Sequence, residues 1–156
     1  MKVIGYGKAK EEDIVAYEQK TGCRLPNDYR QFLLEYNGGE PEIKENHLIF
    51  PEIKSSTMKV CYFSWITKTK EVIKHYEQNL LEEVESLGMF IDPKCVIPFV
   101  GVYGSIPMVM ITKEGMEGIY LFDFQLALKE SSRKKYLHKV CDTFTEFLEL
   151  IVPNEQ

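Results

Sequence analysis

Three histidines and two glycine-containing turns are the first places in this sequence where catalytic chemistry could be sought. His47, His75 and His138 are scattered over different predicted elements. An imidazole acts as a general base only within hydrogen-bond reach of its partner, and no motif supplies one here. The run Gly101–Ser105 lacks the spacing of a nucleophile elbow, and Gly5–Lys8 is too short for a phosphate-binding loop. We therefore predict a protein that is not an enzyme and needs no cofactor.

Four cysteines form the second group of reactive side chains: Cys23, Cys61, Cys95 and Cys141. They make no Cys-x-x-Cys pair and have no histidine at ligand spacing, so we predict no metal site. Each lies among apolar or aromatic neighbours, and the chain shows no secretory signal. These features favour buried, reduced thiols over disulfides and indicate the cytoplasm.

An acidic segment follows the Gly38-Gly39 pair, with only two lysines close by in sequence to offset it. Its members are Glu40, Glu42, Glu45 and Glu52, and the lysines are Lys44 and Lys54. One interpretation is a solvated surface. The other is a protruding acidic segment that holds a cationic partner.

Composition narrows the class of protein. The 156 residues are 44% hydrophobic and 28% charged, which is ordinary for a globular chain, and we predict one domain over residues 1–156. A net charge of -5 disfavours nucleic acid and anionic membranes as partners. The sequence contains no apolar run of the roughly 18 residues that are needed to span a bilayer.

The helices that would position these residues are marked by apolar spacing and by end signals. We expect one helix over Glu11–Thr21 with Gly22 as its stop, and a second that begins at Pro26. The second carries one apolar face and ends at Asn37–Gly39, because Asn and Gly tolerate the left-handed conformation. Further helices are expected over Lys70–Leu87 and after Thr143. The apolar face of the second helix is Tyr29, Phe32, Leu33 and Tyr36. That of the last helix is Phe144, Phe147, Leu148 and Ile151.

Short β-rich runs between the helices predict strands. The runs are His47–Phe50, Val60–Trp65, Cys95–Val100, Pro107–Thr112 and Gly118–Asp123, with an edge strand over Tyr136–Cys141. Turns are expected at Gly101–Ile106 and Lys113–Glu117. Thr143 with Glu146 fits a capping box. This order of helices and strands predicts the α+β class.

The order of motifs resembles the SUKH superfamily, which groups fungal cell-wall assembly regulators with bacterial immunity proteins. The resemblance rests on YEQKTGCRLPNDYRQFLLEYNGGEP, VIPFVGVYGSIPMVMI, GIYLFDF and TFTEFLELI, which together cover most of the chain. It implies a mixed, mostly antiparallel sheet flanked by helices, without a catalytic site.

The resemblance also implies a function. Most bacterial members look like cytoplasmic proteins that bind and neutralise the toxin domain of a polymorphic secreted toxin, often a nuclease. The alternative is a regulatory or scaffold protein that binds another cytoplasmic protein. A nuclease domain tends to be basic, so the acidic charge of this chain fits the first hypothesis. The predicted contacts with a basic toxin are Glu40, Glu42, Glu52 and Asp123.

Overall fold

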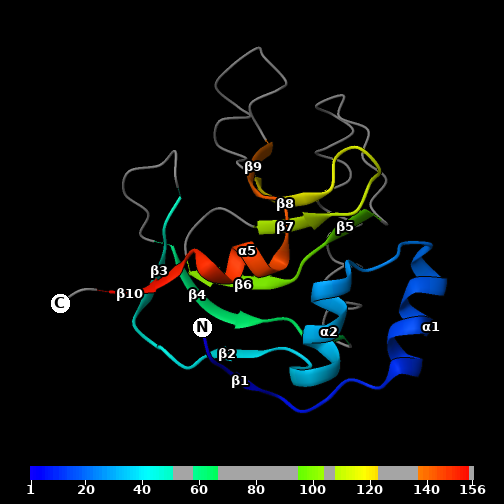
Figure 1. Ribbon diagram of the computed structural model, residues 1–156, viewed down its shortest axis with the longest axis horizontal. Helices are drawn as coiled ribbons and strands as arrows, with labels where there is room; N and C mark the ends of the chain where they lie inside the picture. Colours follow the sequence, from blue (N-terminus) through cyan, green and yellow to red (C-terminus); the bar gives the residue numbers. More distant parts are fainter. Residues whose placement is uncertain (51–57, 67–94, 104–107, 123–136, 155–156) are drawn as a thin grey trace.

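The structure is a computed structural model and describes residues 1–50, 58–66, 95–103, 108–122 and 137–154 (Figure 1). Three helices lie in these ranges: α1 (Glu11–Thr21), α2 (Asn27–Tyr36) and α5 (Phe144–Glu149). None of them is long and apolar enough to cross a bilayer. The helix expected over Lys70–Leu87 lies outside the described residues.

The two N-terminal helices have the end signals that their sequence predicts. The bounds of α1 match the prediction, and Gly22 caps it with φ 69° while donating its N–H to the Glu18 carbonyl. Pro26 precedes the first helical residue of α2 and does not occupy it, which shifts the predicted start by one position. Asn37 closes α2 in the left-handed conformation, with φ 47°, and its N–H bonds to the Leu33 carbonyl.

The strands form three hydrogen-bonded sheets, and every strand pair among the described residues is antiparallel. The first sheet has the order β1 (Val3–Gly5), β2 (Gly39–Pro41), β4 (Lys59–Phe63) and β6 (Val100–Tyr103). The second pairs β3 (Asn46–Leu48) with β10 (Ile151–Pro153). The third has the order β5 (Val96–Ile97), β7 (Met108–Ile111), β8 (Gly118–Phe122) and β9 (Leu137–Cys141). The α+β class and the predominance of antiparallel pairing are confirmed.

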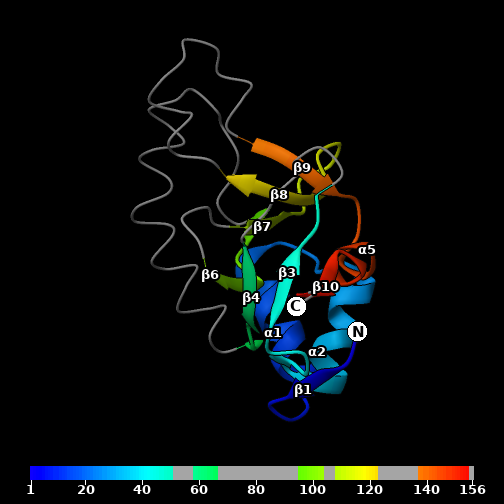
Figure 2. The same cartoon turned by 90° about the vertical axis from the view of Figure 1, so that its left-hand side faces the viewer.

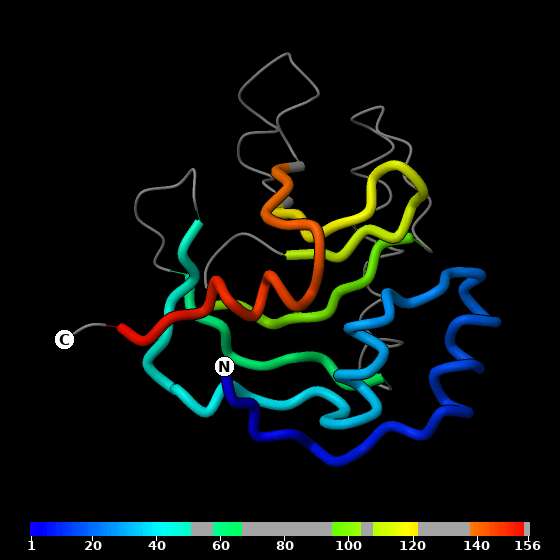
Figure 3. Tube along the Cα trace, in the orientation of Figure 1, coloured from blue at the N-terminus to red at the C-terminus, as the bar shows by residue number. Residues whose placement is uncertain are grey.

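Figure 3 shows how the ends of the chain join this arrangement. The N-terminal strand β1 runs beside β2, and the C-terminal strand β10 runs beside β3. Neither β1 nor β2 was predicted, because three-residue strands carry too little alternation to be read from sequence. The predicted edge strand is confirmed as β9, which lies at one end of its sheet.

One strand prediction, one turn prediction and the predicted end of the last helix are wrong, and prolines explain much of the difference. The run Cys95–Val100 is divided at Pro98, which lacks a backbone donor for a ladder; β5 before it pairs with β7, and β6 after it pairs with β4. As a result, the first half of the expected turn Gly101–Ile106 is strand. Ile151 is likewise not in the last helix. It pairs with Leu48 as the first residue of β10, two residues before Pro153.

The core is aromatic, and α2 and α5 supply most of its rings. Figures 1 and 2 show these two helices side by side, and Phe144 of α5 lies with its ring centroid 4.8 Å from that of Phe32 and 5.1 Å from that of Tyr29. Phe63 of β4 and Phe99, between β5 and β6, complete the cluster at 6.0 and 5.9 Å from Phe144. The apolar faces predicted for both helices therefore pack into the core, where Tyr36 and Leu148 are only partly buried and Ile151 arrives from a strand.

Candidate functional site

Two of the four predicted contact residues lie in the described part of the chain. Glu40 is the central residue of β2, and Glu42 follows that strand directly. Glu52 and Asp123 lie outside the described residues. From here on, the name acidic segment is kept for the described part of that region, residues Gly39–Glu45. Its position is set by β1, since Ile4 lies opposite Glu40 in the ladder and the Glu42 N–H bonds to the Lys2 carbonyl at 3.0 Å.

The start of the acidic segment requires glycine. Gly38 and Gly39 have φ values of 83° and 141°, which residues with a side chain rarely adopt. A Cβ on Gly38 would lie 2.7 Å from the Phe63 carbonyl oxygen, and one on Gly39 would lie 2.4 Å from that of Ile4. The two glycines that follow the Asn37 cap therefore let β2 enter between β1 and β4.

Two of the glutamates in the acidic segment are paired within the chain. Glu40 accepts from the Lys44 ammonium and, at 3.3 Å, from the Tyr6 hydroxyl. The hydrogen bond and charge of Lys44 lower the pKa of Glu40, with a smaller contribution from Tyr6. Glu45 pairs with Lys59 of β4 at 3.1 Å. Glu42 is exposed and forms no ion pair with any described residue, so it is the least compensated charge of the segment.

Exposed apolar side chains surround these carboxylates. Ile4 and Tyr6 are 55% and 48% exposed, and Ile43 is 38% exposed. Tyr6 also stacks edge-on against Trp65 with ring centroids 5.4 Å apart. Isoleucine and tyrosine next to carboxylates make a surface that can bury apolar area and meet a cation together.

Asn46 holds the C-terminal end of the acidic segment, and sequence reasoning missed it. Its side chain is 1% exposed. The amide nitrogen donates to the carbonyls of Ile43 at 2.8 Å and Val60 at 3.2 Å, and the amide oxygen accepts the Val60 N–H at 2.9 Å. The Asn46 side chain thus makes the hydrogen bonds that join the backbone at Ile43 to β4. In the sequence, Asn46 is marked only as an asparagine before an apolar run. That pattern is too common to predict a buried, hydrogen-bonded side chain.

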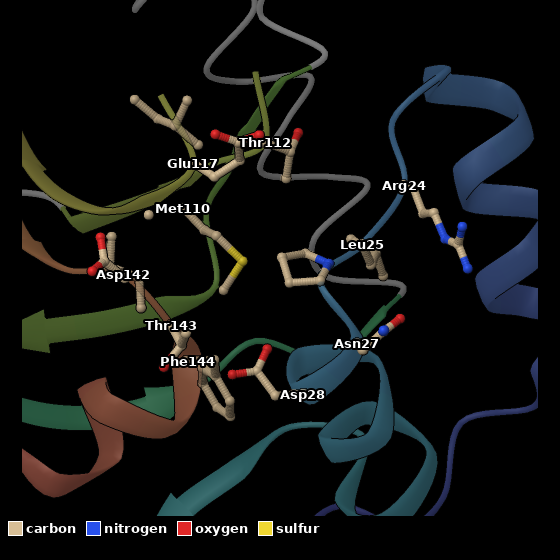
Figure 4. Close-up of a pocket in the computed structure, with 14 residues that line it drawn as sticks. Arg24, Leu25, Asn27, Asp28, Met110, Thr112, Glu117, Asp142, Thr143 and Phe144 are labelled. Carbon is tan, nitrogen blue, oxygen red and sulfur yellow. The ribbon is translucent and has the colours of Figure 1, made fainter. Parts of the chain in front are cut away.

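A cleft of about 410 Å³ lies on a different side of α2, between its N-terminus and the β7–β8 hairpin. Figure 4 shows Arg24, Leu25 and Asn27 along one wall and Met110, Thr112 and Glu117 along the other. The N-terminal end of α5 closes it with Asp142, Thr143 and Phe144. Apolar side chains and acidic groups therefore share this cleft.

Two of the three described acidic groups that line the cleft are already engaged. Asp28 accepts from the Thr145 N–H at 2.9 Å and from the Thr145 hydroxyl at 3.1 Å, which joins α2 to α5. Asp142 pairs with Lys139. Glu117 is exposed and makes no hydrogen bond or ion pair with another described residue. The cleft can receive a side chain, but its acids mainly hold the fold together.

No described histidine is placed for acid or base chemistry. His47 Nδ1 lies 2.6 Å from the Asn154 amide oxygen, across the pair of β3 and β10. His138 lies on the edge strand β9, and His75 lies outside the described residues. Within the same described ranges, no three His, Cys, Asp or Glu side chains gather as a metal-binding group.

Comparison with known proteins identifies the family. A comparison with curated proteins gave no match. The profile of the SMI1/KNR4 family (SUKH-1) matches residues 8–150, which include α1, α2, the strands from β2 to β9 and α5. A match over this much of the chain confirms the expected resemblance. The chain belongs to the SMI1/KNR4 family (SUKH-1).

Proposed function

We propose that this protein is an immunity protein that binds and neutralises the toxin domain of a cognate polymorphic toxin in the cytoplasm. Its family includes immunity proteins of polymorphic toxin systems. The family match over residues 8–150 is the observation that carries the proposal. The toxin is proposed to be a nuclease, because a domain that acts on a polyanion tends to be basic and the net charge of this chain is -5.

Neutralisation is proposed to work by occlusion without catalysis. Among the described carboxylates, Asp28 has a structural role, since it joins α2 to α5. A protein that covers an active site needs a rigid surface with complementary charge, and it needs no nucleophile or general base.

The proposed contact surface is the acidic segment, which includes the exposed Ile43, together with its apolar neighbour Ile4. Glu42 supplies an exposed charge that can meet an Arg or Lys of the toxin. Glu40 can exchange its exposed pairing with Lys44 for one across an interface at small cost, since exposed ion pairs contribute little. Glu52 and Asp123 remain proposed contacts of the same kind.

Inhibition of the toxin tests this proposal. The toxin domain encoded beside the gene for this chain is purified, and its activity is titrated with wild-type protein and with the double variant Glu40→Ala/Glu42→Ala. The matched control is Glu114→Ala/Glu149→Ala, which removes two exposed carboxylates outside the acidic segment. We expect stoichiometric inhibition by the wild type and the control, and weaker inhibition by the first variant.

The outcomes separate the function from the surface. If the wild type neither binds nor inhibits the toxin domain, the immunity proposal is wrong, and the regulatory alternative becomes the better one. If both double variants inhibit like the wild type, the immunity function stands and the acidic segment is not the contact.

A further inference from the structure

Two of the four cysteines meet across the fold. Cys23 lies in the connection between α1 and α2, and Cys95 directly precedes β5, 72 positions later in the sequence. Their sulfur atoms are 3.6 Å apart, which is a van der Waals contact between two thiols. Sequence spacing gave no indication of this pair, because neither residue belongs to a Cys-x-x-Cys motif.

The two thiols differ in access to solvent. Cys23 is 6% exposed, whereas Cys95 is partly exposed. A small oxidant in solution therefore reaches Cys95 first, and Cys23 lies behind it. A partly exposed cysteine backed by a second thiol is the arrangement of a redox-sensitive pair with an attacking and a resolving residue.

The other two cysteines lack this arrangement. The prediction of buried thiols is confirmed for Cys23, but Cys95 and Cys141 are only partly buried and Cys61 is exposed on β4. The Cys61 thiol lies 3.8 Å from the Lys59 carbonyl oxygen. Burial, followed by the charges of Glu146 and Asp142, raises the pKa of Cys141 to about 12. The Cys141 thiol therefore stays protonated at neutral pH and is a poor nucleophile.

We propose that Cys23 and Cys95 form a reversible intramolecular disulfide by exchange with a low-molecular-weight disulfide. The Cys95 thiol loses its proton to solvent, and the thiolate attacks one sulfur of the small disulfide. A mixed disulfide forms and one small thiol leaves. The Cys23 thiol then loses its proton, its thiolate attacks the Cys95 sulfur, and the second small thiolate leaves and takes up a proton. Two protein thiols are oxidised and one small disulfide is reduced to two thiols, so atoms and electrons balance.

The positions of the two residues allow the sulfur atoms to approach. Bond formation needs a separation of about 2.05 Å. Cys23 follows Gly22, the helix cap with φ 69°, and Cys95 precedes a strand of two residues, so both lie at the ends of elements. Ends of elements adjust more easily than their interiors.

The bond would join the two walls of the cleft. On one side, Arg24 and Leu25 follow Cys23 directly and line the cleft. On the other side, Thr112 lines it and donates its N–H to the Cys95 carbonyl at 2.9 Å. Oxidation would therefore fix the α1–α2 connection to the third sheet and stabilise the fold by closing a long loop.

The test uses the full chain with Cys61→Ser, which removes the exposed thiol that could link two molecules. The protein is incubated under native conditions with oxidised glutathione as the probe, free thiols are alkylated, and the digest is analysed by mass spectrometry. We expect one linked peptide pair that contains Cys23 and Cys95. Its formation should raise the thermal midpoint, and a dithiol reductant should reverse both changes.

Two further variants identify the order of attack. In Cys23→Ser/Cys61→Ser the mixed disulfide should accumulate on Cys95, because no resolving thiol remains. In Cys61→Ser/Cys95→Ser we expect Cys23 to react at least tenfold more slowly, because it is buried. The unaltered chain, treated in the same way, should give the same linked pair, so the test does not depend on the folding of a variant.

Three results would overturn the proposal. They are the absence of a Cys23–Cys95 link in folded, unaltered protein, a predominant link to Cys141, and modification of Cys23 at the same rate as Cys95. The proposal does not rest on the immunity function, and the test requires no toxin.

Discussion

The aromatic core and the acidic segment both adjoin α2, but different interactions keep them in position. Phe144 and Phe147 are 2% and 0% exposed, and each packs against rings from other elements. Glu40, by contrast, has a side chain that is 44% exposed and pairs with a lysine only four residues away. The core is therefore fixed by burial, and the acidic segment by a few polar contacts and two glycines.

This difference separates stability from recognition. Removing a buried ring leaves a cavity and lost contacts, whereas removing an exposed carboxylate changes the stability of the fold very little. Substitutions in the core should then act on folding alone, and substitutions in the acidic segment should act on binding alone. The predictions below test this division, starting from the largest expected change in the free energy of unfolding.

Truncation of the core should have the largest effect. Phe147 is fully buried, and its ring centroid lies 5.1 Å from that of Phe99, so Phe147→Ala should cost about 3 to 5 kcal/mol of unfolding free energy. Leu33→Ala, at another fully buried position, should cost about 2 to 5 kcal/mol. Urea denaturation measures both costs. Toxin binding per folded molecule should be unchanged, and a stable variant that loses binding would break the division.

Asn46 lies between the core and the acidic segment, so its substitution should affect both stability and binding. Asn46→Ala leaves the buried N–H and carbonyl of Val60 without their side-chain partners, so we expect a loss of about 2 to 3 kcal/mol. The same change frees the end of the acidic segment and should also weaken toxin binding. Chemical denaturation and calorimetric binding measure the two effects. A change in stability with wild-type affinity would show that the segment does not need this anchor.

The capping box at the start of α5 should have a smaller effect. Thr143 accepts the Glu146 N–H at 3.1 Å, and the Glu146 carboxylate accepts the Thr143 N–H at 3.3 Å. Thr143→Ala should therefore cost about 1 kcal/mol, while Thr143→Ser keeps the hydroxyl and should cost less. Thermal unfolding of the two variants gives the comparison. Equal losses would mean that the threonine methyl group, and not the cap, stabilises the helix.

Tyr17 tests whether every polar group in the core is satisfied. Its side chain is 1% exposed, and its hydroxyl has no hydrogen-bond partner in the described structure. Tyr17→Phe should therefore leave stability at neutral pH unchanged or raise it by up to about 1 kcal/mol. A loss of more than that would indicate a hydrogen bond to the hydroxyl.

The same residue predicts a dependence on alkaline pH. Burial, and then the neighbouring Tyr29 and Cys23, raises the pKa of Tyr17 above its ordinary value of 10.0. Above pH 10 the unfolded chain releases this proton while the folded chain keeps it, so stability falls as pH rises. One proton contributes a slope of about 1.4 kcal/mol per pH unit. The unfolded tyrosine is only half ionised at pH 10, so between pH 10 and 11 the loss of stability should be smaller in Tyr17→Phe by about 1 kcal/mol, as measured by denaturation.

The sequence predicted the parts of the fold that repeat a pattern. The spacing of Tyr29, Phe32 and Leu33 identified a buried helix face, and Thr143 with Glu146 identified the cap of α5. Both follow from local rules that tertiary contacts did not override. Ile151 continued the apolar spacing of α5, but strand pairing with Leu48 took it out of the helix.

The candidate site was harder to predict, because its properties depend on residues far apart in the chain. Tyr6 reaches Glu40 across 34 positions, and Lys59 reaches Glu45 across 14. Lys44 was visible in the sequence as a partner of Glu40, whereas the contact of Tyr6 with Glu40 and that of Lys59 with Glu45 were not. Cys23 and Cys95 meet across 72 positions for the same reason. No local sequence pattern predicts a contact between two residues that are so far apart in the chain.

The central claim is that this protein neutralises a basic toxin through an acidic surface, and association kinetics test it most directly. Binding of the wild type and of Glu40→Ala/Glu42→Ala to the cognate toxin domain is measured at low and high salt. Because charge acts mainly on encounter, raising salt should slow association of the wild type more than it speeds dissociation. The double variant should associate more slowly at low salt and approach the wild-type rate at high salt. An association rate that is independent of salt and identical for both proteins would contradict the claim.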